Sequence, residues 1–420
     1  MSRNIRFIHC SDLHLEAPFK GIHLENEGIW KILEGSTFRS FEKVVQTAIT
    51  QEVDFVLIAG DLYNSSNKSV RAQLFFLHQM KLLADHNIPC LFVHGNHDPI
   101  DSWVVKSELP STIFQFPPYV FCKSLYRTHE EKPFVNIIGY SYPKRDVQKN
   151  IAQEIAQHSR SLDQDTFNIG LLHCNVGGDP STENYAPCSL QDLLQSNIHY
   201  WALGHVHTRK VLHENQPAVI YPGNTQGLHI NESQQKGLYL VDVHDQEVDY
   251  RWIETSSFLW FQPTLQVADS TIDSISEDVI QAMIENTQSL PGIFRFTLEG
   301  RTSLHHILQK EIHEIEDSIR ENLEQEYCYL ESINLQTKPD IDIEAIKKRK
   351  DFNSLFAHKA EELLNSEDIS VKIATLLTDM PLDKLFKILP ENHSSIPWEN
   401  IVTNALYLGL TLLAEEKNES

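Results

Sequence analysis

The chain has 420 residues, and this length favours two or three domains over a single one. Its hydrophobic content of 41% and charged content of 22% are those of an ordinary soluble globular protein, and no run of about 18 apolar residues predicts a transmembrane helix. The net charge is −8 over residues 1–257 and −15 over residues 258–420, which argues against a broad basic surface that coats nucleic acid. A local basic groove or a bound metal ion can still attract phosphate, so phosphate substrates are not excluded.

The cysteines and the N-terminus bear on the compartment. The six cysteines are scattered and none forms a Cys-x-x-Cys pair, so thiolate-bound zinc is not expected. The first residues lead directly into an apolar strand, without the apolar core or the cleavage site of a secretory signal. Both observations predict a cytoplasmic protein with free thiols.

The first part of the chain alternates short apolar strands with amphipathic helices. Strands are expected at residues 5–10, 53–59 and 88–93, and helices at residues 36–51 and 69–87. This order predicts three successive strand–helix units, and such units place the carboxyl ends of their parallel strands at one edge of a sheet. In open α/β sheets, ligands bind at that edge.

Polar residues follow each of these strands. Asp12 and His14 follow the first strand, and an extended chain would project them to the same side because they are two residues apart. Asp61 follows the second strand, directly after Gly60. The third strand leads to Gly95, which permits a tight turn or a close backbone approach. The residues after that glycine are Asn96, His97 and Asp98.

The same pattern recurs further along the chain. After a loop and edge-strand excursion, the expected elements are strands at 135–140, 167–172 and 200–203 and helices at 144–161 and 190–195. His173 follows the second of these strands, and His205 and His207 follow Gly204 after the third. Antiparallel strands are then expected to close the domain, at residues 219–221, 237–243 and 247–253.

The polar strand ends form a set of nitrogen and oxygen donors. Its members are Asp12, His14, Asp61, Asn96, His173, His205 and His207. So many ligands exceed the need of one ion and suit two divalent ions that share a carboxylate, with Mn²⁺ expected and Fe²⁺ or Zn²⁺ able to accept the same donors. Two such ions about 3.5–4 Å apart can hold a hydroxide and clamp a phosphate for in-line attack. His97 would protonate the leaving oxygen or stabilise phosphoryl charge, and Asp98 would orient the His97 ring.

These motifs resemble the five-part signature of the calcineurin-like metallophosphoesterases over about the first 257 residues. The segments at residues 9–15 and 221–227 resemble the DNA repair exonuclease branch of that family, which includes SbcD and the YhaO-type proteins. The resemblance implies an α/β fold, a four-layer β-sandwich flanked by helices. One departure is that a supporting histidine often follows Gly-Asp in this branch, whereas Tyr63 and Asn64 follow it here. This departure affects the expected nuclease efficiency or the preferred phosphoester, and not the expected metal site.

The resemblance also implies how the donors divide between two metals. One metal would be bound by Asp12, His14, Asp61 and His207. The other would be bound by Asp61, Asn96, His173 and His205. Homodimers are common in the family, and the partner implied by resemblance is a coiled-coil ATPase of the SbcC or YhaN type.

The rest of the chain is expected to form two smaller regions. Residues 258–336 resemble a small α/β capping domain, with strands at 264–267, 292–298 and 327–334 and helices at 271–287 and 303–325. Residues 337–420 are expected to form a helical, partner-binding region, which begins with a linker at 337–340 and continues with helices at 343–364, 370–389 and 397–416. The basic run at 347–350 is either a solvated helix face or a DNA contact. The last helix is apolar on most sides, so it packs within a helical bundle or docks on a partner.

Three functions remain open. The leading hypothesis is a two-metal phosphodiesterase that acts on DNA in repair, as an exonuclease or endonuclease, together with an ATPase. The second is a phosphodiesterase for small or nucleotide substrates. The third is a catalytically weak adaptor of the ATPase, and the complete ligand set argues against it because an adaptor does not need these donors.

Overall fold

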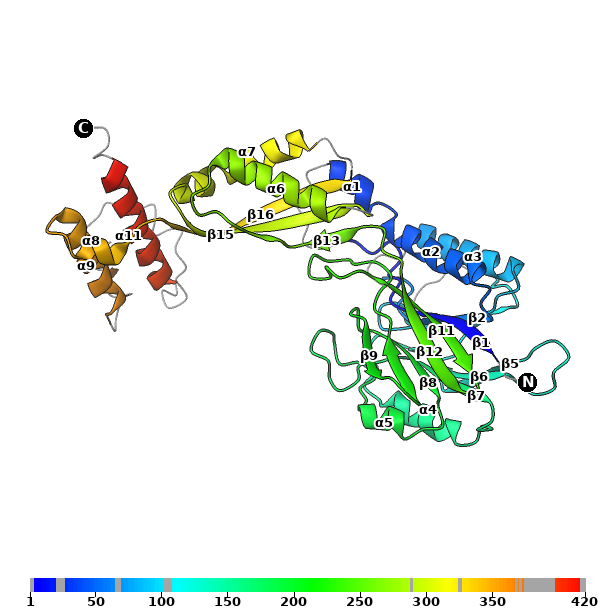
Figure 1. Cartoon of the computed structure of the whole chain (residues 1–420). Helices are drawn as coiled ribbons and strands as arrows, with labels where there is room; N and C mark the ends of the chain where they lie inside the picture. The colour runs from blue at the N-terminus through cyan, green and yellow to red at the C-terminus, as the bar shows by residue number, and fades with distance from the viewer. Residues whose placement is uncertain are drawn as a thin grey trace. The chain divides into compact units, whose positions relative to one another are not determined.

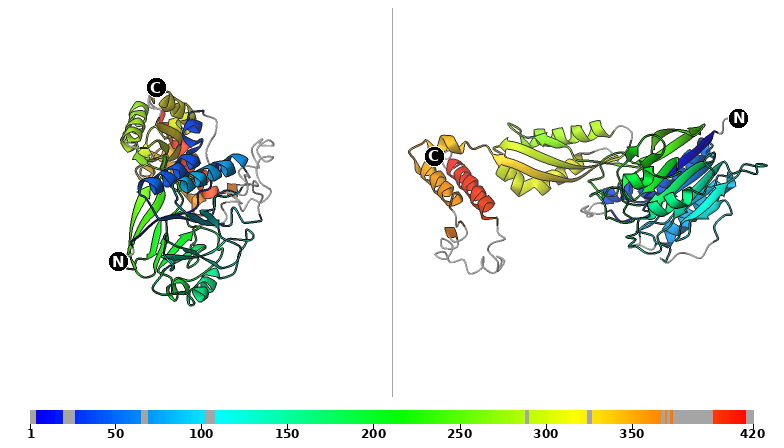
Figure 2. Two further views of the ribbon diagram at one scale, coloured as in Figure 1. Left: turned by 90° about the vertical axis from the view of Figure 1, so that its right-hand side faces the viewer. Right: turned by 90° about the horizontal axis from the view of Figure 1, so that it is seen from below.

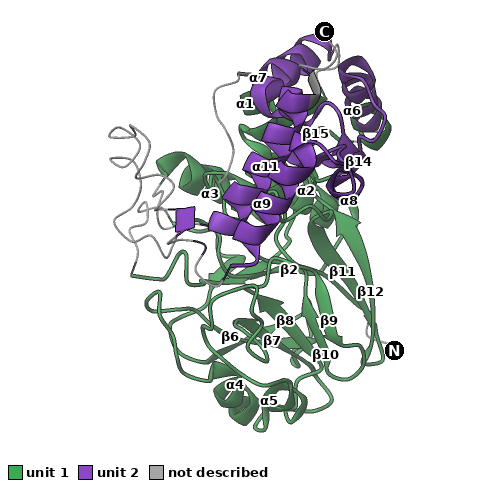
Figure 3. Cartoon of the chain, turned by 90° about the vertical axis from the view of Figure 1, so that its left-hand side faces the viewer, with its two compact units in different colours: residues 1–262, 283–295, 325–331 green, residues 263–282, 296–324, 332–420 purple. Residues whose placement is uncertain are grey.

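The computed structural model describes residues 4–19, 27–64, 69–101, 108–287, 290–323, 327–366, 369, 372–373 and 397–415. These residues fall into two compact units, drawn in green and purple in Figure 3, and each unit is considered by itself. The first comprises residues 1–262, 283–295 and 325–331, and the second comprises residues 263–282, 296–324 and 332–420. The three-domain division expected from the sequence, with boundaries after residues 257 and 336, stays a prediction.

The first unit is built on two six-stranded sheets. The first sheet has the strand order β12-β11-β1-β2-β3-β4, in which β1 to β4 run parallel and β11 runs antiparallel to both β1 and β12. Its strands are β1 (Ile5–Cys10), β2 (Phe55–Ala59), β3 (Cys90–Val93), β4 (Ile113–Gln115), β11 (Gly237–His244) and β12 (Glu247–Glu254).

The second sheet has the strand order β5-β6-β7-β8-β10-β9. The four inner strands β6, β7, β8 and β10 run parallel, and β5 and β9 are antiparallel edges. Its strands are β5 (Phe121–Leu125), β6 (Val135–Tyr140), β7 (Phe167–His173), β8 (Tyr200–Gly204), β9 (Lys210–His213) and β10 (Ala218–Tyr221).

The two sheets pack face to face, and helices cover their outer faces (Figures 1 and 2). Along β1, Phe7 points into the core between the sheets and Ile8 into the core under the helices, so this strand is apolar on both faces. Helices α2 (Ser36–Thr50) and α3 (Val70–Asp85) cover the first sheet, and α4 (Ile151–Ser159) and α5 (Leu190–Leu194) cover the second. This arrangement confirms the predicted four-layer sandwich.

Local sequence accounts for the helix boundaries. The Ser69 side chain accepts a hydrogen bond from Ala72 N and begins α3, and Asn150 caps α4 through Gln153 N. In α2 the buried apolar residues recur at helical spacing, with Phe41 fully buried in the middle of the stripe. Burying one such phenylalanine stabilises the fold by about 1.5–3 kcal/mol.

One sequence expectation about the closing strands is wrong. β10 was expected to be one of several antiparallel strands that follow the site, but it runs parallel to β8 in the second sheet and pairs antiparallel only with β9. The short strand β9 was not expected. β11 and β12 are antiparallel as predicted, and β11 joins β1 in the first sheet through pairs such as Arg6 with Asp242. Local periodicity carries no information about pairing between such distant segments.

A third sheet follows the sandwich in the chain. Its strands are β13 (Leu259–Phe261), β14 (Thr264–Gln266), β15 (Gly292–Thr302) and β16 (Cys328–Pro339), and β15 pairs with each of the others. Helices α6 (Ile272–Asn286) and α7 (His305–Asn322) alternate with these strands, as predicted. The linker expected at residues 337–340 is wrong, because β16 continues to Pro339. Helix α1 (Glu27–Leu33), which was not expected, packs on Phe258 and Trp260 near β13.

Three helices are described after β16. They are α8 (Ile343–Lys347), α9 (Phe352–Leu364) and α11 (Trp398–Glu415). The helix expected at 343–364 is divided in two because the Asp351 side chain accepts a hydrogen bond from Ser354 N and begins a new helix. The helix expected at 370–389 lies almost entirely outside the described residues. Lys347 of the basic run is paired with Glu344 and Glu361, as expected of a solvated helix face. Within the described part of the chain, every helix is too short or too polar to span a bilayer.

Candidate metal centre

The predicted donors come from strand ends of both sheets of the sandwich. Asp12 and His14 follow β1, Asp61 follows β2, and Asn96 follows β3, all in the first sheet. His173 ends β7, and His205 and His207 follow β8, in the second sheet. Hydrogen bonds join the two groups: His173 Nδ1 donates to Ala59 O at 2.9 Å, and His205 N donates to the Asp12 carboxylate at 3.1 and 3.2 Å.

The backbone at several donors is left-handed rather than extended. The φ angles are 52° at Asp12, 42° at His14, 52° at Asp61 and 100° at His205. Asp12 and His14 do contribute to one donor group, as expected, but the backbone that carries them is not extended. The segment is held instead by hydrogen bonds from Asp12 N to Gly60 O and from His14 N to Asp61 O, each 3.0 Å long. Non-glycine residues in this region are strained, and such strain is common at functional sites.

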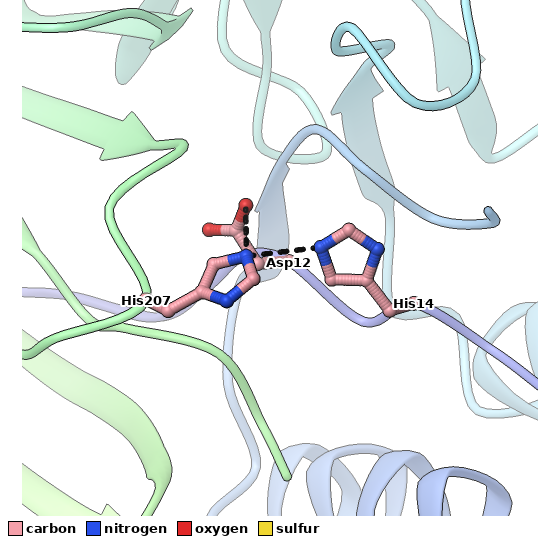
Figure 4. Close-up of side chains that lie close together, drawn as sticks. All are labelled: Asp12, His14 and His207. Carbon is pink, nitrogen blue, oxygen red and sulfur yellow. Dashed lines mark hydrogen bonds and ion pairs between the residues drawn. The ribbon is translucent and has the colours of Figure 1, made fainter. Parts of the chain in front are cut away.

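The first group of donors consists of Asp12, His14 and His207, whose ligand atoms all lie within 4.8 Å of one another. His207 Nε2 lies 3.1 Å from His14 Nε2 and 3.9 Å from Asp12 Oδ1, the two contacts dashed in Figure 4. Asp12 and His14 are buried, and His207 is partly exposed. The group thus has one carboxylate and two imidazole nitrogens that point toward a common position.

The second group consists of Asp12, Asp61 and His173, again with ligand atoms within 4.8 Å. Asp61 Oδ2 lies 3.4 Å from His173 Nε2 and 3.7 Å from His14 Nε2, so this carboxylate lies between the two groups. Asn96 Oδ1 is 3.0 Å from His173 Nε2 and belongs with the second group. Asp61 thus lies near a histidine of each group, whereas Asp12 is the carboxylate that both groups contain.

Gly95 and Gly204, which each precede a donor, are required for steric reasons. A Cβ on Gly95 would overlap the Asp61 carboxylate and lie 2.8 Å from His173 Nε2. A Cβ on Gly204 would overlap Ala59 O in the facing sheet. The donors can therefore converge only because these two residues have no side chain.

His205 is turned partly away from the other donors. Its Nε2 lies 2.6 Å from Glu183 O and 2.7 Å from Thr182 Oγ1, in the loop at residues 177–187. The ring centre of His205 is 4.9 Å from that of His173. This arrangement leaves Nδ1 as the nitrogen with which His205 would bind a metal.

Burial and charge set the protonation of the donors. Burial lowers the pKa of His14 to about 3 and that of His205 to about 4. Burial also opposes the charge on His173, but Asp61 outweighs it and raises the pKa of His173 to about 9. Conversely, burial would raise the pKa of Asp61, and His173 with His14 and His97 lowers it well below its usual range. Asp61 and His173 thus favour each other's charged forms in the metal-free centre.

The residues expected to act on the substrate have different surroundings. His97 N donates to Asp61 Oδ1 at 2.9 Å, and its half-buried ring lies 5.0 Å from that of His14, centre to centre. The prediction that Asp98 orients the His97 ring is wrong. Asp98 accepts hydrogen bonds from Gly95 N, Leu62 N and His94 Nδ1 at 2.9–3.1 Å. It thereby stabilises the loop at residues 94–98.

Asn64, rather than Asp98, contacts the His97 ring. Its Oδ1 lies 3.4 Å from His97 Nδ1. Asn64 lies in the segment after Gly60 and Asp61 where the sequence departs from the family it resembles, and that departure was the available signal. Adjacent side chains such as those of His97 and Asp98 point apart in this loop, whereas the i, i+4 spacing of His94 and Asp98 lets them meet.

Sequence reasoning also missed Glu232. Its Oε1 accepts a hydrogen bond from His207 Nδ1 at 2.8 Å. Burial opposes the charge of Glu232, but His207 and Lys236 lower the pKa of Glu232 to about 2. Burial likewise opposes the charge on His207, and Glu232 raises its pKa. No local pattern marks a single glutamate in a polar loop, so only the structure identifies it.

The donor set fits divalent metal ions. Carboxylate, amide and imidazole donors without cysteine suit Mn²⁺, Fe²⁺ or Zn²⁺. The buried His14 Nδ1 has no hydrogen-bond partner among the described residues, while its Nε2 faces His207. A cluster of buried imidazoles and carboxylates is costly unless its members are paired or bind an ion. The assignment of each donor to a particular metal stays a prediction.

The fold and this site define a calcineurin-like metallophosphoesterase. The family model "calcineurin-like phosphoesterase" matches residues 5–209, and the model of the middle domain of the metallophosphoesterase YhaO matches residues 264–338. YhaO of Bacillus subtilis (strain 168) is 36% identical over 307 residues, which cover 71% of this chain and 73% of YhaO. The chain therefore belongs to the calcineurin-like metallophosphoesterases, in the branch of YhaO.

Two archaeal relatives extend the comparison. The DNA double-strand break repair protein Mre11 of Methanocaldococcus jannaschii is 24% identical over 59% of this chain and 65% of its own length. Mre11 of Aeropyrum pernix is 28% identical over 55% of this chain and 56% of its own length. In each case the match spans less than two thirds of the relative. Together with YhaO, these proteins confirm the predicted DNA repair exonuclease branch.

Proposed function

We propose that the protein is a two-metal phosphodiesterase that hydrolyses phosphodiester bonds in DNA. The observation that carries the proposal is the convergence of the Asp12, His14 and His207 group and the Asp12, Asp61 and His173 group at one end of the sandwich. When bound, two divalent ions supply an activated water and neutralise the charge of a phosphate. We propose Asn96 and His205 as further ligands of the second metal and Mn²⁺ as the metal in the cell.

His97 is the proposed general acid. Its backbone N–H is fixed by Asp61 and its ring is half-buried, so the ring stays beside the donors while one edge can reach a substrate. Asn64 Oδ1 near His97 Nδ1 supports donation from the other ring nitrogen, Nε2, to the leaving oxygen. General acid catalysis of this kind contributes about 10²–10⁴-fold in rate.

DNA is the proposed substrate because the chain matches proteins named for DNA double-strand break repair. The acidic net charge of −23 means that the metals and nearby groups, rather than a broad basic surface, would attract the phosphate. The six free cysteines support a reducing compartment, and we propose the cytoplasm.

The His97→Ala variant tests the catalytic proposal. Wild-type protein with Mn²⁺ should cleave single- or double-stranded DNA and bis(p-nitrophenyl) phosphate. The variant should lose about 10²–10⁴-fold in kcat while its bound Mn²⁺ is unchanged. His86→Ala, at an exposed histidine on the end of α3, is the matched control and should behave as wild type.

The outcomes separate the alternatives. Absence of cleavage of both substrates by the wild-type protein with Mn²⁺ would refute the catalytic proposal and favour an adaptor. Cleavage of the small diester but never of DNA, even with the ATPase partner present, would favour a phosphodiesterase for small substrates.

We further propose that the helices of the second unit bind a coiled-coil ATPase of the SbcC or YhaN type. Apolar side chains on α9 and α11 support this proposal, since Phe352 is 64% exposed, Leu355 59% and Leu412 54%. Leu355→Asp together with Leu412→Asp should abolish co-purification with such an ATPase and leave cleavage of the small diester unchanged. Retained co-purification would refute this binding surface.

A further inference from the structure

The two donor groups differ in the hydrogen bonds that orient their histidine rings. A histidine that binds a metal through one ring nitrogen is oriented by the hydrogen bond of the other. His173 Nδ1 donates to a backbone carbonyl, Ala59 O, at 2.9 Å. His207 Nδ1 donates to a side-chain carboxylate, Glu232 Oε1, at 2.8 Å. The two groups are therefore asymmetric: only the His207 group has an additional negative charge directly behind a ligand.

Glu232 is itself held in place. Its Oε2 accepts hydrogen bonds from Asn224 Nδ2 and from Leu228 N, both at 2.8 Å. Lys236 Nζ donates to His207 O at 2.8 Å, so the same loop also fixes the backbone of that ligand. With both of its oxygens bonded, the Glu232 carboxylate has one orientation, and its hydrogen bond to His207 is preformed.

The same segment also braces the carboxylate that the two groups share. Ser11 forms an isolated β-bridge with Asn224, and Ser11 Oγ lies 3.2 Å from Gly223 O. Ser11 Oγ also lies 2.5 Å from Asp12 Oδ2. The loop at residues 223–236 therefore contacts His207 directly and reaches Asp12 through a single intervening residue.

We propose that Glu232 is a positioning residue that selectively strengthens metal binding at the position formed by Asp12, His14 and His207. It does so by fixing the His207 ring with Nε2 toward that position and by making this imidazole a stronger donor through its negative charge. At the other position, formed by Asp12, Asp61 and His173, the backbone carbonyl of Ala59 orients the His173 ring, so this position does not depend on Glu232. This inference rests on the two-metal site proposed above.

The test is a metal titration of the full-length protein. Wild type and Glu232→Gln are freed of metal with a chelator, titrated with Mn²⁺ by isothermal calorimetry, and their bound Mn²⁺ is counted after dialysis. Glutamine keeps the size of the side chain and an acceptor oxygen but removes the charge. Glu214→Gln, at an exposed glutamate outside the site, is the matched control. Thermal unfolding of the metal-free proteins checks that the variant is folded.

The expected result is that wild type and the control bind two Mn²⁺, whereas Glu232→Gln keeps one at wild-type affinity and binds the other about 10- to 100-fold more weakly. Glu232→Asp, which keeps the charge on a shorter side chain, should weaken the same position by less, and it serves as the second variant if glutamine prevents folding. Two unchanged affinities, or equal weakening of both positions in a folded variant, overturn the inference but leave the two-metal site. Failure of the wild-type protein to bind two Mn²⁺ overturns the proposed site itself.

Discussion

The buried His9 predicts how stability depends on pH. His9 lies in β1 between the two sheets, where its Nε2 donates to Leu203 O at 3.2 Å and its Nδ1 accepts from the Tyr200 hydroxyl at 2.9 Å. Both contacts suit the neutral ring. Burial lowers the pKa of His9 to about 3, well below the value of about 6.5 in an unfolded chain.

The direction in which the free energy of unfolding changes with pH follows from proton uptake by the unfolded chain. Because the folded-state pKa is lowered, the unfolded chain binds a proton below pH 6.5 that the folded chain does not bind. The free energy of unfolding therefore falls as the pH decreases from 6.5 toward 3. At about 1.4 kcal/mol per pH unit, His9 alone removes about 2 kcal/mol between pH 8 and pH 5.

The perturbation is His9→Gln, which cannot be protonated and keeps one donor and one acceptor. Urea unfolding of metal-free protein, followed by near-ultraviolet circular dichroism, gives the free energy of unfolding at several pH values. The variant should lose about 1 kcal/mol at pH 8 from weaker hydrogen bonds, and this deficit should vanish or reverse at pH 5. The exposed-site control His86→Gln should keep the wild-type pH dependence. An equal decline in wild type and His9→Gln between pH 8 and pH 5 would refute the reasoning.

Three further predictions concern the metal centre. Asp98→Ala should destabilise the protein by about 2–4 kcal/mol, because Leu62 N and Gly95 N lose their buried acceptor. The thermal unfolding midpoint of the variant should therefore fall even without metal, and an unchanged midpoint would contradict the structural role of Asp98. Gly95→Ala should abolish binding of at least one Mn²⁺, since its methyl group would overlap Asp61, and metal analysis after dialysis measures this loss. Metal binding at pH 7 should release about one proton from His173, because the pKa of His173 is raised to about 9. Calorimetry in buffers of different ionisation enthalpy measures this release, and a binding heat that is independent of the buffer would contradict the prediction.

Candidate donors could be predicted from the sequence because their positions follow from strand repetition. Parallel strands present their carboxyl ends together, so a polar residue after each apolar strand is a local pattern with a three-dimensional consequence. Asp12, Asp61 and His173 were found in this way, and the structure brings their ligand atoms within 4.8 Å. The pattern does not say which sheet each strand joins, because pairing between segments as distant as β1 and β11 leaves no local trace.

The residues that sequence reasoning missed or misassigned act through side-chain geometry. Asp98 was paired with its neighbour His97 by proximity in sequence, but the turn after Gly95 directs its carboxylate to His94 instead. Glu232 reaches His207 across 25 residues of chain, and nothing in the polar loop around it distinguishes this carboxylate from a solvated one. Contacts of this kind depend on where a loop returns, which hydrophobic periodicity does not encode.

The backbone at the centre explains why glycines and donors alternate there. Gly95 and Gly204 stand where a Cβ would collide with Asp61 or with Ala59 O, so no side chain is possible at these positions. Asp12, by contrast, adopts a left-handed φ of 52°, which costs a non-glycine residue about 1 kcal/mol or more. Glycine would relieve that strain but would remove a donor common to both groups. A strained backbone is thus kept where the side chain is a candidate donor, and glycine stands where a side chain would not fit. The same division applies to Gly60 and the strained Asp61 that follows it.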